Sequence, residues 1–409
     1  MKKIIFILFI LTLAAPFSVF AVEEPFGDDP LDVVGKKPFI IHERRFEVGL
    51  ANMNVFFANN FLTFKQVFNE TVQINLDELK DGFNMNVGLN MSPFYFTYTS
   101  KKGWGFGLHT GVQGIGILSL SGNMLSLSEA VKETSDLSGA LFASATISSK
   151  FNIKKFKVKF NPSLFYSLAY IKPEGLTYTM THNDSTTLRI DYDLQVFAAV
   201  PIENFGSGFS LTGKPGFDIT AGVSFPLAKE IGITKILPFL DFDISLDFIN
   251  IPIAPSKMFD YMQLKDSVGG EIDFDHLDDF INIDSNAVYG KEEVGVRRPF
   301  KMLLSLDWRP LFGSRLLTVT PVVGFGISKL YGKVGSFEAG INGRLNIANC
   351  FIATLGVNYT DRMFVNSLNL AINFRAFELD LGAELRSQKF TKSWSGGGLG
   401  VNFGIKFGW

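Results

Sequence analysis

Hydrophobic and polar residues alternate along much of this chain, most regularly in its last segment. Apolar side chains stand at every second position from Leu399 to Trp409, and the residues between them are small or polar. Successive side chains of a β-strand point to opposite faces, so this period of two gives a strand one apolar and one polar face. A barrel wall that meets lipid on one side and water on the other needs this pattern.

The same period recurs upstream, for example over Trp104–His109, Leu188–Val196, Leu240–Phe248, Phe337–Leu345 and Phe377–Arg386. With weaker neighbours, these segments predict strands near 45–57, 84–99, 103–119, 138–150, 155–170, 174–182, 187–199, 215–226, 236–249, 299–309, 316–327, 334–347, 350–360, 364–375, 376–388 and 397–409. We therefore expect about 14 to 16 strands in the barrel. The segment 174–182 is either an extension of the strand before it or a strand of its own, and the first strand belongs either to the barrel wall or to the lumen. We predict an all-β fold, a transmembrane antiparallel up-and-down β-barrel with an N-terminal or inserted plug segment.

Residues 1–21 have the features of a bacterial signal peptide. Two lysines precede an apolar run that ends at Phe20, and Ala21 completes a fitting cleavage site. A single membrane-anchoring helix is the alternative, but Pro16 and Ser18 shorten the apolar run below the length of a bilayer-spanning helix. We therefore expect export, cleavage near Ala21 and location in the bacterial outer membrane.

The rest of the chain divides into a periplasmic or lumenal N-terminal segment, 22–44, and the outer-membrane barrel, 45–409. Two insertions interrupt the barrel pattern: a helix or plug segment over 58–83, and a long acidic loop over 250–298 that should face outward. Aromatic residues share one face of the first insertion and would form a hydrophobic pocket if it folds into the lumen. These candidate plug or pocket residues are Phe61, Phe64 and Phe68.

Composition supports a wall that meets lipid. The 409 residues include 43 Phe and 39 Gly, and only 19% are charged, whereas soluble domains average about a quarter. A soluble sandwich or a solenoid is the competing fold, but a solenoid needs a fixed internal repeat, and none is present. The net charge of −2 gives no reason to expect nucleic-acid binding. Cys350 is the only cysteine, which excludes an intramolecular disulfide.

Charged residues on the polar faces of the predicted strands are the candidate lumen-lining positions. They are Arg189, Asp191, Asp193, Asp241, Asp243, Asp247, Glu338, Arg344, Glu378, Asp380, Glu384 and Arg386. Such residues either line a solute path or hold a plug by salt bridges, since charged rings tune the selectivity of pores. The alternative is that they are simply what any polar barrel interior contains.

The sequence gives little indication of a catalytic site or a metal site. Of the four histidines, only His109 falls on a lumen-facing strand position, and no nucleophile lies near it in sequence. The acidic stretch 271–284 lacks the ordered glycine and distal glutamate of a calcium-binding EF-hand loop. We therefore predict no enzyme activity, no catalytic residue, no metal and no cofactor.

The last residues resemble the signal by which the barrel-assembly machinery recognises its clients. Its features are an aromatic final residue and apolar residues at alternate positions before it, here Phe403, Ile405, Phe407 and Trp409. Most such signals end in Phe, so Trp409 is a departure. The resemblance implies two partners, the assembly machinery and outer-membrane lipid.

Three further stretches resemble spirochaetal outer-membrane barrel paralogues that have been compared with the long-chain fatty-acid transporter family. They are Asn59–Leu62 followed by Val72–Asp77, then Lys102–Gly107, and Ile249–Pro255. The resemblance implies a barrel whose lumen is plugged by an N-terminal segment or an inserted loop, and uptake of hydrophobic solutes. It assigns no ligand-binding residue in this chain.

Two functions remain open at this point. The first is passage of small solutes across the outer membrane, hydrophobic ones such as fatty acids included. The second is a surface-exposed adhesin or structural barrel that acts through its outer loops on a host or cell-surface ligand. Fold alone cannot choose between them, because function depends on the loops and the lumen.

Overall fold

The computed structural model describes residues 45–60, 82–122, 130–182, 186–199, 212–271, 287–311, 316–328, 335–374, 376–394 and 397–409. The predicted signal peptide, the N-terminal segment 22–44 and the aromatic residues Phe61, Phe64 and Phe68 lie outside the described residues.

Seventeen strands form one sheet. They are β1 (Phe46–Asn59), β2 (Phe83–Thr99), β3 (Gly105–Leu120), β4 (Ala130–Ile153), β5 (Phe156–His182), β6 (Thr186–Ala198), β7 (Gly216–Phe225), β8 (Asp241–Ala254), β9 (Ser256–Glu271), β10 (Ala287–Val296), β11 (Phe300–Arg309), β12 (Leu317–Ile327), β13 (Gly335–Ile347), β14 (Phe351–Thr360), β15 (Met363–Asn373), β16 (Phe377–Ser387) and β17 (Gly398–Gly408). The short helices between them are α5 (Leu227–Glu230), the 3-10 helix η3 (Ile233–Lys235) and α6 (Phe390–Trp394). Across the described ranges, no helix has the length and hydropathy of a membrane span.

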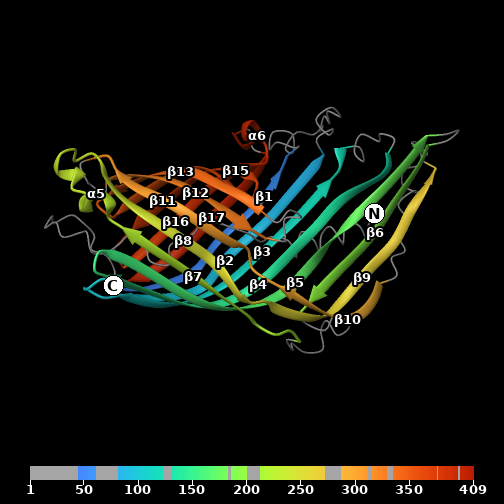
Figure 1. Cartoon of the computed structure of the whole chain (residues 1–409), viewed down its shortest axis with the longest axis horizontal. Helices are drawn as coiled ribbons and strands as arrows, with labels where there is room; N and C mark the ends of the chain where they lie inside the picture. The colour runs from blue at the N-terminus through green and yellow to red at the C-terminus, as the bar shows by residue number, and fades with distance from the viewer. Residues whose placement is uncertain are drawn as a thin grey trace.

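Fourteen of these strands close into an antiparallel barrel. Strands β1 to β5 pair in sequence order, and the ring continues through β7 and β8 to β11. Strands β11 to β17 again pair in order, and β17 pairs with β1 to close the ring. Figure 1 shows these strands lying obliquely side by side. The predicted antiparallel barrel is confirmed, at the lower end of the expected strand number.

The other three strands, β6, β9 and β10, extend the sheet beyond the ring at one end. Strand β9 follows β8 after Pro255, and β10 precedes β11 with Pro299 between them. Proline lacks the N–H that a sheet ladder needs, which explains breaks at these points. The end of β5 pairs with β6, β6 with β9, and β9 with β10. We call this four-stranded extension the projecting sheet; β6 and β9 reach the right edge of the barrel in Figure 1.

The projecting sheet corrects the expectation of a long acidic loop over 250–298. Most of the described part of that range is strand, namely the end of β8 together with β9 and β10. Three consecutive charged residues, Lys291, Glu292 and Glu293, are all exposed on β10. A strand outside the bilayer needs no apolar face toward lipid, so the period of two that identifies the other strands is interrupted here.

The C-terminus marks one end of the barrel, which we call the inner end. The short connections predicted around 101–103, 152–154 and 348–349 lie at this end, because each joins two neighbouring ring strands there. Ala348 and Asn349 have φ values of 54° and 55°, the left-handed conformation that a type I′ turn requires at both central positions, and the Cys350 N–H donates to the Ile347 carbonyl oxygen at 3.0 Å. The projecting sheet and α6 lie at the opposite, outer end.

Apolar side chains cover the outside of the ring. Val323, Ile341 and Val401 are 48%, 50% and 47% exposed, although each lies within a strand that is paired on both sides. Their neighbours in sequence point inward, as the alternation predicts. The outside therefore presents a continuous apolar band, which we call the lipid-facing band, and the inside is left to polar residues.

Candidate functional site

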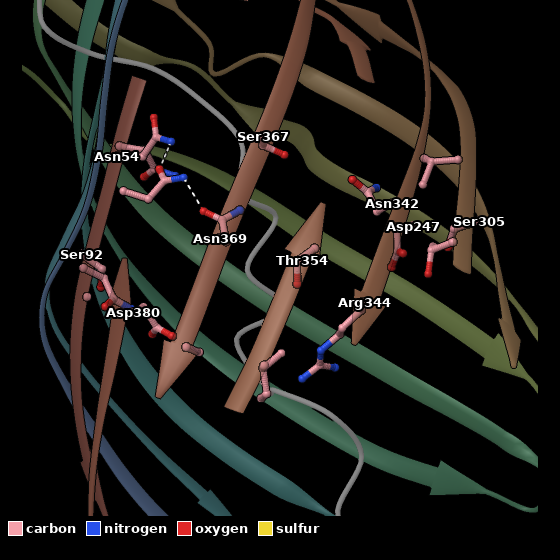
Figure 2. Close-up of a pocket in the computed structure, with 18 of the residues that line it drawn as sticks. Asn54, Ser92, Asp247, Ser305, Asn342, Arg344, Thr354, Ser367, Asn369 and Asp380 are labelled. Carbon is pink, nitrogen blue, oxygen red and sulfur yellow. Dashed lines mark hydrogen bonds between the residues drawn. The ribbon is translucent and has the colours of Figure 1, made fainter. Parts of the chain in front are cut away.

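A cavity of about 1000 Å³ occupies the inside of the barrel. Its lining comes from most of the ring strands and consists largely of asparagine, serine, threonine and charged side chains. Figure 2 shows Asn54, Asn342, Asn369 and Arg344 among the side chains that extend into it. Polar side chains reach the cavity because they occupy the alternate positions that the lipid-facing band leaves free.

The charges around the cavity balance. Among the described lining residues there are eight cations and eight carboxylates. The cations are Lys150, Lys157, Lys159, Lys301, Arg309, Arg344, Arg386 and Lys406, and the carboxylates are Glu47, Asp243, Asp247, Asp307, Glu338, Glu378, Asp380 and Glu384. A lining with no net formal charge does not select strongly between cations and anions, since charge selectivity comes from rings of one sign.

Near the inner end, Arg309 on β11 lies between two carboxylates of the neighbouring strand β8. Its Nε is 3.2 Å from Asp241 Oδ2, and its Nη2 is 2.7 Å from Asp243 Oδ1. Two planar carboxylates that face one guanidinium use several of its fixed N–H donors at once. All three side chains are buried, so the group holds β8 and β11 together and narrows this part of the lumen.

Nearer the outer end, Lys301 on β11 is enclosed by acceptors from β13, from β14 and from the turn after β14. Its Nζ is 2.9 Å from Glu338 Oε1, 3.0 Å from Asp361 Oδ1 and 3.1 Å from Thr360 Oγ1. Asp361 lies in the tight turn between β14 and β15, with φ at 50°. One buried ammonium thus offsets two buried carboxylates, an arrangement that is costly to disrupt.

A third polar group surrounds Glu384 on β16. This carboxylate pairs with Arg386 and accepts hydrogen bonds of 3.1 Å from the Nδ2 atoms of both Asn54 and Asn402. The Arg386 guanidinium lies 3.7 Å from the centre of the Phe56 ring, a cation–π contact. Ion pairs and amide hydrogen bonds therefore fix the wall across the β1–β17 seam.

Most of the predicted lumen-lining residues border the cavity. Those that do are Asp243, Asp247, Glu338, Arg344, Glu378, Asp380, Glu384 and Arg386. Asp241 is buried next to it, paired with Arg309. Arg189, Asp191 and Asp193 lie instead on β6, in the projecting sheet. Whether any of these charges guides a solute or holds a plug stays a prediction.

Asp193 has its own partners in the projecting sheet. Gln263 Nε2 donates to it at 2.6 Å, and Lys265 Nζ lies 3.2 Å away. Partial burial acts to raise the pKa of Asp193, but these hydrogen bonds and the lysine charge together lower it below its ordinary value. The sequence pattern placed Asp193 in the lumen because a period of two does not tell where a strand leaves the membrane.

His109 faces the lumen, as expected. The structure also places the Ser148 hydroxyl next to it, although the two residues lie 39 positions apart in sequence. Its Nε2 is 3.0 Å from Ser148 Oγ, and its ring stacks on Tyr95 at a centroid distance of 5.3 Å. Ser148 is fully buried, so no substrate reaches its Oγ in this arrangement. Within the described ranges, no group of His, Cys, Asp and Glu is placed to hold a metal ion.

Sequence reasoning missed an apolar cluster on the lumen side of the wall, at the base of the projecting sheet. We call it the outer apolar cluster; its buried members are Ile115, Ala140, Phe142, Phe165, Tyr170, Phe197, Ala199, Met258 and Val296. Leu164 is 56% exposed on the outside, so Phe165 beside it points inward. The Phe142 and Phe165 rings meet edge to face, 5.9 Å apart.

The outer apolar cluster could not be predicted from local patterns, because its members come from six strands that span residues 115–296. The only available signal was the aromatic residues at inward positions of neighbouring strands. A smaller cluster of Phe56, Ala58, Met363 and Val365 lies across the barrel, also on inward positions toward the outer end. Inward positions toward the outer end therefore hold apolar clusters beside charged groups such as that of Lys301, and the lining of the cavity itself is largely polar.

The predicted assembly signal lies on the outside of β17. Phe403, Phe407 and Trp409 are exposed, and Ile405 is partly exposed. The Trp409 ring stacks on Phe46 of β1 at 5.8 Å, so the last residue packs across the seam that closes the ring. Recognition of these residues by an assembly machinery stays a prediction.

No protein-family model matches this chain, and no curated protein matches it. Among solved structures, it is similar to the toluene transporter TodX of Pseudomonas putida, with 8% identity, a TM-score of 0.48, and coverage of 96% of this chain and 95% of that one. It is also similar to the translocator domain of the autotransporter NalP of Neisseria meningitidis (10% identity, TM-score 0.31, coverage 93% and 91%) and to Acinetobacter baumannii OccAB1 (9%, 0.27, 88% and 96%). Likenesses this weak assign no function to this chain.

Proposed function

We propose that this protein is an outer-membrane barrel through which small solutes pass, hydrophobic solutes among them. The observation that carries the proposal is the cavity of about 1000 Å³ inside a closed ring. A barrel that served only as an anchor would need no such space, and an eight-stranded ring filled by side chains would suffice.

The two apolar clusters support hydrophobic solutes. Ligand sites for such molecules are lined mainly by hydrophobic and aromatic side chains with a few polar groups. The outer apolar cluster supplies three phenylalanines, and Arg298 lies 5.1 Å over the Phe165 ring while it is bound to Asp218. The members of both clusters are buried against one another, so a solute would contact them only after they rearrange. Fatty acids, which the sequence resemblance implies, have an apolar chain that would suit the rearranged clusters and a polar head that would suit the cavity.

The projecting sheet favours a second candidate, an interaction at the cell surface. It extends beyond the ring, and among the described strands β10 pairs only with β9. Unpaired strand edges are places where another chain can add a strand, although the exposed charges at 291–293 are of the kind that protects edges from such pairing. Its ligand would be a host or cell-surface molecule.

Uptake by intact cells tests the proposal. The protein would be produced in a diderm host that lacks its own fatty-acid barrel, and uptake of a labelled long-chain fatty acid would be measured at equal surface expression. Cells are needed because such solutes cross pure phospholipid vesicles unaided. We expect faster uptake than in cells without the barrel, and a reduction by Asn369→Trp, which places a large ring in the cavity.

Leu368→Trp, at the neighbouring lipid-facing position, is the matched control and should leave uptake unchanged. Uptake that equals that of cells without the barrel, for the fatty acid and for a labelled sugar alike, would refute passage. Binding of these cells to a host surface, without any uptake, would favour the second candidate.

A further inference from the structure

One connection at the inner end differs from its neighbours. The described connections from β2 to β3, from β4 to β5 and from β13 to β14 are short turns. The connection from β7 to β8 spans 226–240 and contains both α5 and η3, joined by Gly232 with φ at 75°. We call it the inner loop. A turn that only reverses the chain needs none of this structure.

The inner loop exposes large apolar side chains. Ile231 is 60% exposed, Ile236 79%, Leu237 38% and Phe239 43%. Each such side chain gains about 1.5–3 kcal/mol when it leaves water for an apolar environment. Four of them close together in sequence therefore favour contact with a surface that removes them from water.

The inner loop adjoins the lipid-facing band. Trp308 Nε1 donates a hydrogen bond of 2.7 Å to the Phe239 carbonyl oxygen. Trp308 pairs with Phe242 on β8 and shares the outward face of β11 with Leu304, which is 42% exposed. Figure 1 shows α5 at the inner end of the barrel, beside β8. The apolar residues of the loop thus continue the surface that already contacts lipid.

The charges of the inner loop fit a lipid surface as well. Lys229 and Lys235 are exposed, and the one acid of the loop, Glu230, is bound by Lys155 of the neighbouring turn. The lysine stems can lie along apolar surface while the ammonium groups stay among headgroups. Apolar residues mixed with lysines are the composition of segments that lie in the membrane interface.

We propose that the inner loop is an interfacial anchor, which lies among the phospholipid headgroups of the leaflet at the inner end and inserts Ile236, Leu237 and Phe239 into the acyl boundary. It fixes the depth and tilt of the barrel on one side only, next to β7, β8 and β11. The proposal depends on the membrane-spanning fold and not on what passes through the lumen.

The single native cysteine makes the test direct. Cys350 is exposed in the short turn between β13 and β14, at the same inner end. A nitrobenzoxadiazole label on native Cys350 is the matched control. The same label is placed on Ile236→Cys, and separately on Lys235→Cys, each in a Cys350→Ser background. The full-length protein is reconstituted into vesicles of phosphatidylcholine and phosphatidylglycerol that contain brominated acyl chains.

We expect several-fold stronger quenching by bromine, and emission at shorter wavelength, at position 236 than at Cys350, with position 235 between them. Equal and weak quenching at positions 236 and 350, with water-like emission, would overturn the proposal. Shielding of position 236 that grows with the protein-to-lipid ratio would also overturn it, because it would show a second copy of the chain in place of lipid. The Lys235→Cys label keeps the test decisive if loss of Ile236 disturbs the loop.

Discussion

Replacing Lys301 with methionine should destabilise the barrel far more than the loss of one surface ion pair. Lys301 is 2% exposed, and its ammonium contacts two carboxylates that are themselves buried, Glu338 and Asp361. Methionine keeps most of the volume of the lysine stem but leaves both carboxylates without their shared cation. Breaking a buried pair by removal of one partner costs about 3–5 kcal/mol, and we expect a loss in that range.

A matched lysine on the projecting sheet provides the comparison. Lys265 is 3.2 Å from Asp193, but its side chain is 71% exposed. Exposed pairs contribute about 0–1 kcal/mol, so Lys265→Met should change stability little. Adding Glu338→Gln to Lys301→Met removes one of the two carboxylates that have lost their cation. The double variant should therefore recover part of the lost free energy of unfolding.

Equilibrium unfolding in urea, in lipid vesicles and followed by tryptophan fluorescence, measures these differences as shifts of the midpoint at constant slope. The reasoning would be refuted if Lys301→Met and Lys265→Met shifted the midpoint equally. It would also fail if Glu338→Gln brought no recovery in the double variant.

Three further substitutions test other parts of the barrel. Phe165→Ala removes a fully buried ring from the outer apolar cluster and should cost about 3–5 kcal/mol in the same urea assay; a loss below about 1 kcal/mol would mean that the cluster is loosely packed. Gly340→Ala places a Cβ where the Asn358 amide oxygen lies, which should cost about 1–3 kcal/mol and lower the temperature at which the band on an SDS gel shifts; an unchanged temperature would show that the amide moves freely. Trp409→Ala removes the stacking on Phe46, worth about 0.5–1.5 kcal/mol, and should slow folding into vesicles; folding at the native rate would show that the seam closes without it.

Most of the ring could be predicted from sequence, because every strand that crosses the lipid bilayer needs apolar residues at alternate positions on its outward face. Phe337 and Ile341 are 60% and 50% exposed on the outside, and Glu338 between them is buried within, as their alternation indicates. Strand segments outside the bilayer do not need this alternation. On β6 the alternation of Asp191 and Asp193 with apolar residues continues into the projecting sheet, and on β10 the three charges at 291–293 interrupt it, so the extent of the projecting sheet could not be predicted.

The polar lining of the cavity could be predicted, but the contacts within it could not. Alternation places Asp243 and Glu338 on inward positions, yet their partners Arg309 and Lys301 lie 66 and 37 residues away in sequence. Residues of β11 also alternate from Phe300 to Arg309 with only Leu303 out of phase, so Lys301 and Arg309 could have been predicted as inward positions, but their partners could not. The outer apolar cluster was missed for the same reason: it is assembled by register between distant strands, which no local pattern contains.

Passage through the lumen is the central claim, and thiol modification of a lumen residue tests it most directly. Asn369 lines the cavity, and Leu368 next to it is 42% exposed on the outside. Each would be changed to cysteine in a Cys350→Ser background, and conductance across a planar bilayer would be recorded before and after a bulky, water-soluble methanethiosulfonate reagent. The account predicts discrete conductance steps that shrink or vanish for Asn369→Cys and persist for Leu368→Cys. Steps that are absent from both variants before the reagent, or that the reagent leaves unchanged at position 369 despite complete labelling, would contradict it.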